Sequence, residues 1–294
     1  MKKAENCREI WGRTDCKSTR ARGTDYKSVR NGRTDCKSAR AVLTVLLMAL
    51  MATGCSAKNP KQSAREVKAS YIIEQLNKGR HIYLDSCIVW GDLDFTMLSN
   101  RNRIAGNLTQ VFVNQSITFN RCLFTGKVKA FDAAKGISAE FAHNLSFTYC
   151  DFRSEVDFTE SIIQGNAFFT GSIFCSTVKL QGAHFRHKKV YFNETKFEDE
   201  AYFQNVVFAG DVNFLHTVFS ASALFQKAVS GGLMFFGDVR FNGYADFSYA
   251  RAVESIFKEA QFNDRFDFEC AVLNSEGLDA RIANPREQTN PHKQ

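Results

Sequence analysis

The 294-residue chain has a formal net charge of +7, but this positive charge is confined to the first part of the sequence. The part up to Gly54 contains 12 Lys and Arg against 5 Asp and Glu, and the remainder carries equal numbers of positive and negative side chains. The balanced remainder lacks the basic excess of a nucleic-acid-binding protein and the negative charge of a protein that mimics double-stranded DNA. We therefore expect no nucleic acid among its partners.

Residues 1–40 contain a polar repeat with a period of ten residues. The sequence Thr-Asp-Cys-Lys-Ser at residues 14–18 recurs at 34–38, and residues 24–28 differ from it only at Tyr26. An Arg-rich segment without apolar positions cannot bury a core, and this one resembles translated repeat DNA of Bacteroidetes genomes. We interpret residues 1–40 as a mis-annotated or disordered leader without a function. A basic nucleic-acid-binding arm is the alternative.

Residues 41–54 resemble the signal peptide of a bacterial lipoprotein. Lys37 and Arg40 lead into an apolar run at 41–51, which is too short to span a bilayer but has the size of a signal-peptide core. The run is followed by Ala-Thr-Gly-Cys, which resembles a lipobox and predicts Cys55 as the lipidated mature N-terminus. Ser56 in place of Asp resembles lipoproteins of the outer membrane that face the periplasm. A buried helix that ends in Gly-Cys is the alternative.

Residues 55–80 predict a polar tether followed by a capping helix. Apolar residues between Ala64 and Leu76 provide one broad face, and Gly79 suits a helix C-cap. A short amphipathic helix is not stable alone. We therefore expect this helix to cover the first turn of the structure that follows.

Residues 81–275 are dominated by a repeat of eleven residues. Phe recurs at alternating steps of five and six residues, so most of the 28 Phe fall into two columns, and a small or β-branched residue stands two positions before each large one. This period matches neither a half-buried strand nor an amphipathic helix. Each half-unit instead has two inward positions, and we expect the chain to turn a corner after each and to wind into a solenoid. One repeat carries an extra residue near Lys188, and another lacks one near Glu254.

The five-residue word, small-x-large-x-x, resembles the consensus of the pentapeptide-repeat family over roughly residues 82–275. The resemblance implies an all-β fold, a right-handed quadrilateral β-helix, here with a short N-terminal capping α-helix. Two features depart from the consensus. Alternate words carry a sixth residue, so one turn should take two eleven-residue units, and the Asn or Asp before the central Phe is often replaced, as by Phe168, Tyr191 and Leu224. A β-sandwich of many short strands is the alternative.

The repeat is interrupted in two places and ends before the C-terminus. The polar residues 99–107 predict a surface loop of about 15 residues in all, and the rhythm is disturbed again over 127–138. Residues 276–294 are polar, contain Pro285 and Pro291, and are predicted to be a disordered tail.

The sequence contains no recognisable catalytic or cofactor-binding motif. It has no nucleophile elbow, phosphate loop, HExxH or dinucleotide fingerprint, so we predict neither an enzyme nor a cofactor. Cys87, Cys122 and Cys150 occupy the small inward position and are interpreted as small buried hydrophobes. No Cys or His spacing predicts a metal site.

One outward polar row follows from a turn of two eleven-residue units. Each member stands two residues after a core Phe, and the row consists of Glu194, His216, Asp238 and Glu259. Neighbouring members should lie about 4.8 Å apart, as between adjacent strands of a sheet. We interpret the row as a solvated face on which His216 pairs with neighbouring carboxylates. A cation site is the alternative.

A possible partner groove is predicted where the second column of large residues is broken. Ser230 and Ala252 replace Phe, and they stand two eleven-residue units apart, which makes them neighbours in consecutive turns. An unfilled Phe-to-Ala void costs about 3–5 kcal/mol. Met234 is large enough to fill part of it, and Gly231 and Gly232 let the backbone bend. We predict an inward dent or a local bulge at this place.

Together these patterns predict a non-enzymatic, lipid-anchored solenoid that serves as a scaffold or protein-binding module in the bacterial cell envelope. The expected partner is another envelope protein, and the expected membrane contact is the lipid on Cys55. A cation- or small-ligand-binding element is the alternative. Some pentapeptide-repeat proteins bind DNA gyrase by resembling DNA, and the charge balance makes this the weakest of the hypotheses. The sequence indicates no oligomeric state.

Overall fold

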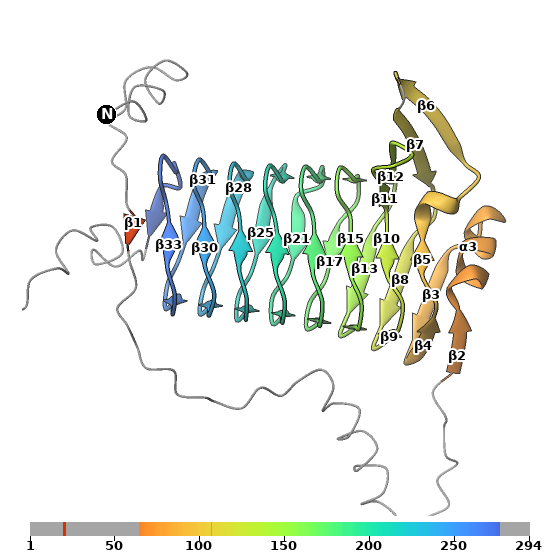
Figure 1. Ribbon diagram of the computed structural model, residues 1–294, viewed down its shortest axis with the longest axis horizontal. Helices are drawn as coiled ribbons and strands as arrows, with labels where there is room; N and C mark the ends of the chain where they lie inside the picture. Colours follow the sequence, from red (N-terminus) through yellow and green to blue (C-terminus); the bar gives the residue numbers. More distant parts are fainter. Residues whose placement is uncertain (1–19, 22–64, 107, 277–294) are drawn as a thin grey trace, which may run out of the picture. The chain divides into compact units, whose positions relative to one another are not determined.

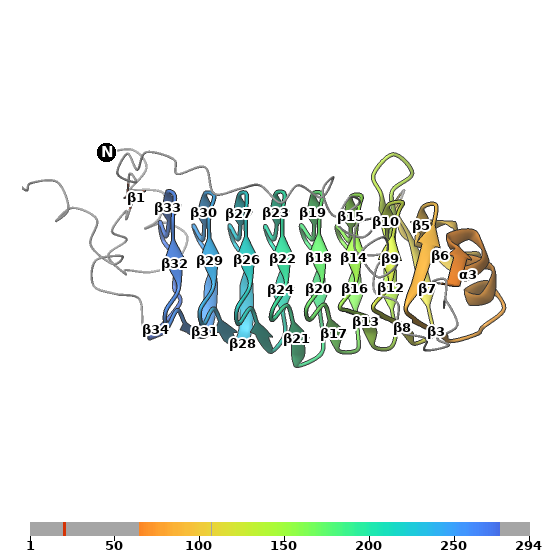
Figure 2. The same cartoon turned by 90° about the horizontal axis from the view of Figure 1, so that it is seen from below.

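The eleven-residue repeat winds into a solenoid of parallel β-strands whose turns lie side by side (Figures 1 and 2). The computed structural model describes residues 20–21, 65–106 and 108–276. The chain divides into two units, of which the unit at 24–65 lies outside the described residues except for Arg65. The solenoid belongs to the unit that contains residues 66–294. Its parallel strands confirm the predicted all-β repeat fold.

The strands form four faces, which follow one another in chain order within each turn. Face 1 contains β3 (Ile82–Asp85), β8 (Ile117–Asn120), β13 (Leu145–Thr148), β17 (Ala167–Phe168), β21 (Lys189–Tyr191) and β25 (Asp211–Asn213). Face 2 contains β4 (Cys87–Trp90), β9 (Leu123–Phe124), β14 (Asp151–Phe152), β18 (Ile173–Phe174), β22 (Lys196–Phe197), β26 (Val218–Phe219), β29 (Arg240–Phe241) and β32 (Gln261–Phe262). Face 3 contains β5 (Leu93–Asp94), β10 (Val128–Lys129), β15 (Val156–Asp157), β19 (Val178–Lys179), β23 (Ala201–Tyr202), β27 (Ala223–Leu224), β30 (Ala245–Asp246) and β33 (Phe266–Asp267). Face 4 contains β7 (Leu108–Val113), β12 (Ile137–Phe141), β16 (Ile162–Ile163), β20 (His184–Phe185) and β24 (Val207–Phe208).

Two long strands join face 4 to face 1 near the C-terminal end of the solenoid. These strands, β28 (Val229–Phe235) and β31 (Arg251–Ile256), continue through a corner that the earlier turns form without a strand. The strand β34 (Ser275–Glu276) pairs with β31, and the short strand β1 (Arg20–Ala21) pairs antiparallel with β33. As a result, faces 1 and 4 belong to a single 16-stranded sheet.

The strand register gives the length of each turn. Val190 pairs with Val212, and Val212 pairs with Met234, so each of these turns takes two eleven-residue units as predicted. Ala167 pairs with Val190 in a turn that is one residue longer, because the extra residue lies in the exposed corner at 186–189. Met234 pairs with Ser255 in a turn that is one residue shorter. Single-residue changes therefore fall at corners and leave the faces in register.

Phenylalanine rings stack along the interior of the solenoid. The ring centroids of Phe203 and Phe225 are 4.6 Å apart, and those of Phe225 and Phe247 are 4.8 Å apart, with ring planes within 7°. Rings of neighbouring columns meet edge to face, as do Phe214 and Phe225 at 5.5 Å and 90°. All these rings are fully buried. The stacked rings repeat at about the spacing of adjacent strands. Stacked and edge-to-face arrangements are both geometries that aromatic pairs favour.

The corner residues two positions after a central Phe have left-handed backbone conformations. The φ angle is 59° at Glu194, 57° at His216 and 61° at Glu259. Where Asp or Asn precedes the central Phe, its side chain accepts a hydrogen bond from the backbone N–H two residues later. Asp157 accepts one from Thr159 over 2.9 Å, for example. This hydrogen bond stabilises the corner and explains why the repeat favours Asp and Asn at that position.

The N-terminal end of the solenoid is covered by the helix α3 (Ala69–Asn77), which contacts β3 and β5 (Figure 1). Its buried face includes Ala69, Ile72 and Leu76. The prediction that the helix begins near Ala64 is wrong, since residues 65–68 form the strand β2 (Arg65–Lys68), which adds to β4 at the edge of face 2. These residues form a strand and not a helix because a strand supplies backbone hydrogen-bond partners to the otherwise open edge of β4.

Two insertions branch off the regular turns, and each forms an antiparallel strand pair. The strand β6 (Arg101–Ala105) pairs with β7, so a hairpin replaces the predicted surface loop, and it projects beyond the turns in Figure 1. The strand β11 (Phe131–Asp132) pairs with β12. A short 3-10 helix, η1 (Phe95–Met97), precedes the first insertion. Since β7 and β12 also pair with each other in face 4, neither insertion interrupts the stacked turns.

Candidate functional site

The predicted partner groove lies at the corner where β28 and β31 pair. Ser230 stands opposite Phe208 on one side and opposite Ala252 on the other, in consecutive turns as the repeat spacing predicts. The pairing register shifts between Ser230 and Leu233. Of the two predicted outcomes, a dent or a bulge, the backbone at this corner shows the bulge.

Close packing against the preceding turn explains the two glycines in the bulge. A Cβ on Gly231 would lie 2.6 Å from the carbonyl oxygen of Ala209, and one on Gly232 would lie 2.9 Å from the carbonyl carbon of Gly210. Ser230 Oγ donates a hydrogen bond to the Gly210 carbonyl over 2.8 Å. Met234 is buried with 1% exposed, so its side chain lies in the interior of the solenoid.

Three exposed valines surround this bulge. Val229, Val253 and Val272 are 36%, 64% and 51% exposed, and we call them the valine patch. Val229 pairs with Arg251, and Arg251 forms a bridge with Val272, so these positions belong to consecutive turns of face 4. Arg251 stands between Val229 and Val272 in this register. Exposed apolar side chains bordered by polar ones are typical of interaction sites. The repeat places Val229 on an outward position between the inward Ala228 and Ser230. The sequence did not single it out as functional, because single outward apolar residues are common on protein surfaces.

The outward polar row is present, and two of its four members are paired. Glu194, His216, Asp238 and Glu259 share one left-handed corner, and His216 Nδ1 lies 2.8 Å from Asp238 Oδ2. Within the described residues, no group of three or more His, Cys, Asp and Glu side chains is arranged to hold a metal ion. The His216–Asp238 contact is the kind of pairing that the solvated-face interpretation predicts.

Charged side chains on face 3 and its corners pair locally. Asp132 lies between Lys129 at 3.0 Å and Lys135 at 3.1 Å, and their hydrogen bonds lower the pKa of Asp132 to about 2. Lys179 lies 2.6 Å from Glu155 and lowers the pKa of that carboxyl group. These charges offset one another, in keeping with the balanced composition of the solenoid.

Several sequence predictions concern residues outside the described part of the chain. These are the leader at 1–40 apart from Arg20 and Ala21, the signal peptide at 41–54, the lipidation site Cys55 and the C-terminal tail from residue 277 onward. Among the residues that are described, no helix has the length and apolar character needed to cross a membrane.

The register, the stacked interior and the four faces define a parallel β-helix built from five- and six-residue units. Comparison with protein families agrees with this class, since the family described as pentapeptide repeats (9 copies) matches residues 180–229. The same five- and six-residue units continue on both sides of the matched residues, so the solenoid is similar to the pentapeptide-repeat proteins beyond the match itself. No curated protein and no solved structure matches the chain.

Proposed function

We propose that the protein is a lipid-anchored, non-enzymatic binding module of the bacterial cell envelope, which holds another envelope protein against its solenoid. The observation that carries this proposal is the valine patch at the β28–β31 bulge. Its three side chains are apolar and exposed, and Val229 lies on backbone that pairs with the turns on both sides, opposite Val207 and Arg251. Exposed apolar groups on a rigid support lose little conformational entropy on binding, which favours a protein partner.

The repeat architecture supports a binding role rather than a catalytic one. Each turn of a solenoid contacts only its neighbours, so the faces form an extended surface along the axis. Charged groups on those faces form local pairs, such as that of Lys179 on face 3 with Glu155. Flat faces with locally neutralised charge suit a scaffold that contacts its partner over a broad area.

The lipid anchor is supported by the sequence of residues 41–55. Metabolic labelling with palmitate should mark the wild-type protein, and Cys55→Ala should abolish the label and leave the precursor unprocessed. Cys36→Ala is the matched control, because this cysteine precedes the predicted cleavage site and its loss should leave labelling unchanged. Persistent labelling of Cys55→Ala would exclude the anchor.

The binding surface is tested by capturing partners from an envelope extract with the wild-type protein and with variants. Val253→Glu and Val272→Glu place charge on the valine patch and should reduce capture of a wild-type partner at least tenfold. Tyr83→Ser is the matched control, since Tyr83 is 72% exposed on β3, far along the chain from the patch. Equal capture by all variants would show that the patch is not the binding surface.

A further inference from the structure

Three cysteines from three successive turns lie in one inward column, which we call the cysteine column. Cys87 is the first residue of β4, and Cys122 and Cys150 directly precede β9 and β14. These three strands pair in parallel register, so the cysteines stand directly above one another. Their side chains are buried, with at most 3% exposed, and each keeps its thiol.

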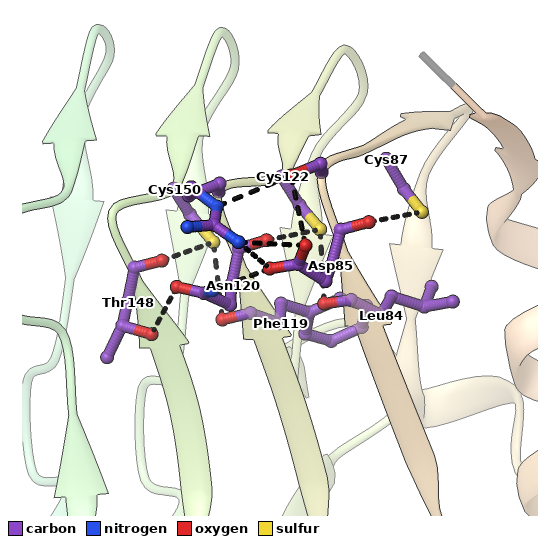
Figure 3. Close-up of polar contacts among 10 residues, drawn as sticks. Leu84, Asp85, Cys87, Phe119, Asn120, Cys122, Thr148 and Cys150 are labelled. Carbon is purple, nitrogen blue, oxygen red and sulfur yellow. Dashed lines mark hydrogen bonds and ion pairs between the residues drawn. The ribbon is translucent and has the colours of Figure 1, made fainter. Parts of the chain in front are cut away.

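The three thiols share one orientation. Each Sγ donates a hydrogen bond to the carbonyl oxygen two residues earlier in the chain, over 3.2 Å for Cys87, 3.3 Å for Cys122 and 3.5 Å for Cys150. Figure 3 shows the three sulfur atoms in a row, one in each turn. Because side chains of equal orientation on in-register strands repeat at the strand spacing, neighbouring sulfur atoms lie about 4.8 Å apart.

The fold does not require thiols at these positions, because hydroxyl groups fill the same column in the next three turns. Ser172, Thr195 and Thr217 are buried and donate hydrogen bonds to backbone carbonyls over 2.8, 2.9 and 2.6 Å. Ser172 Oγ also accepts a hydrogen bond from the backbone N–H of Cys150 over 2.9 Å. Hydroxyls therefore satisfy the packing and hydrogen bonding of the column. What thiols add is the ability to bind soft cations as thiolates.

The sulfur spacing matches a cation held by two thiolates in a line. Two metal–sulfur bonds of the zinc–thiolate length, about 2.3 Å each, would span about 4.6 Å in a straight line, close to the distance between adjacent turns. A disulfide requires sulfur atoms about 2.05 Å apart, and hydrogen bonds between the turns oppose the movement that would bring them together. Hard cations such as Ca²⁺ take six or more oxygen ligands instead. The geometry thus favours a soft, two-coordinate cation over a disulfide or a hard cation.

We propose that the cysteine column binds one soft monovalent cation, of the Cu(I) or Ag(I) class, between two adjacent turns. Each of the two thiols releases a proton to solvent, and each sulfur donates an electron pair to the cation, so no oxidation state changes. Cys122 belongs to both adjacent pairs, and the column therefore holds one cation. The adjoining corner residues Arg121 and Tyr149 are exposed by 62% and 56%, so opening of this corner gives the cation a short path to the column.

Titration of the full-length chain with Ag(I) tests the site. The protein is reduced with a phosphine in chloride-free buffer, and bound metal is counted by native mass spectrometry and by thiolate-to-metal absorption. Cys122→Ser breaks both pairs and should bind one Ag(I) fewer per chain than the wild type. Cys87→Ser and Cys150→Ser each leave one pair and should keep the wild-type count. The other cysteines of the chain contribute equally to all variants and cancel in the difference.

Ser172→Cys extends the column to four thiols, which divide into two pairs, and should bind one Ag(I) more than the wild type. This gain also keeps the test decisive if Cys122→Ser does not fold, which thermal unfolding of each variant will show. Unchanged counts in Cys122→Ser and Ser172→Cys would overturn the proposal. A disulfide that peptide mapping places between Cys122 and Cys87 or Cys150 in the native protein would also overturn it.

Discussion

The first turns of the solenoid and the later ones build the same interior from very different lengths of chain. Asp85 pairs with Asn120, which lies 35 residues further along the chain, and Asn120 pairs with Thr148, which lies 28 residues further. In the later turns, paired residues of the same face such as Val190 and Val212 are only 22 residues apart. The surplus residues lie in the two antiparallel insertions, β6–β7 and β11–β12. Stacking in register is thus the constant physical requirement, and the length of the corners between faces is free to vary.

Ring stacking in the two regions shows the same point. Phe119 and Phe147 stack at 5.1 Å in the long early turns, and Phe214 and Phe236 stack at 4.9 Å in the regular ones. What differs is the small inward column, which carries thiols in the early turns and hydroxyls in the turns that follow. The regions are therefore equivalent in packing and distinct in chemistry.

The largest expected effect tests whether the packing is equivalent. Phe119→Ala and Phe214→Ala each remove a fully buried ring and should each lower the free energy of unfolding by about 3–5 kcal/mol. Urea denaturation of both variants measures the two losses. A much smaller loss for Phe119→Ala would show that the early turns are less tightly packed than the later ones.

The next effect concerns the bulge, where the regular turns are themselves disturbed. Gly231→Ala places a methyl group 2.6 Å from the Ala209 carbonyl oxygen and should destabilise the protein by about 1–3 kcal/mol, as overpacking does. Ala252→Ser, on the neighbouring strand, is a small substitution without such a clash and serves as the control. Equal midpoints of thermal unfolding for the two variants would mean that the backbone at the bulge shifts to accommodate the added methyl group at little cost in stability.

A smaller effect is expected in the hydroxyl part of the small inward column. Thr217→Val removes a buried hydroxyl that donates to the Phe192 carbonyl over 2.6 Å, and it should cost about 1 kcal/mol. Val239→Thr is the reverse change one turn further on and should cost less, since its hydroxyl can adopt the same geometry. If the two variants lose equal stability, the hydrogen bond does not stabilise the column.

The smallest effect is a pH dependence in the β11–β12 insertion. The pKa of Asp132 is lowered to about 2 by Lys129 and Lys135, against about 3.9 in an unfolded chain. The stabilisation by these pairs is therefore present above pH 4 and is lost as the pH falls toward 2. Asp132→Asn should show a lower melting temperature than the wild type at pH 5, and the difference should shrink between pH 4 and pH 2. A difference that does not change with pH would exclude this linkage.

The sequence by itself determined the solenoid, the position of its inward residues and the places where the repeat gains or loses a residue. This was possible because each five-residue repeat unit shows by its own pattern which side chains face inward, and many units show the same pattern. The spacing of Ser230 and Ala252 predicted their contact for the same reason. It also placed Cys87, Cys122 and Cys150 in the small inward position, which identified them as buried.

Tertiary structure decided the features that depend on how one turn meets another or meets an end. Residues 65–68 form a strand because β4 offers an edge, and residues 101–105 form a strand because β7, which pairs with β12 on one side, offers its other edge. The exposure of Val253 depends on the fold, because this residue lies where the register of β28 and β31 shifts. The three cysteines align only because two early turns of unequal length return to the same strand register. The spacing of the cysteines in the chain does not predict this alignment, since the corners between faces can vary in length.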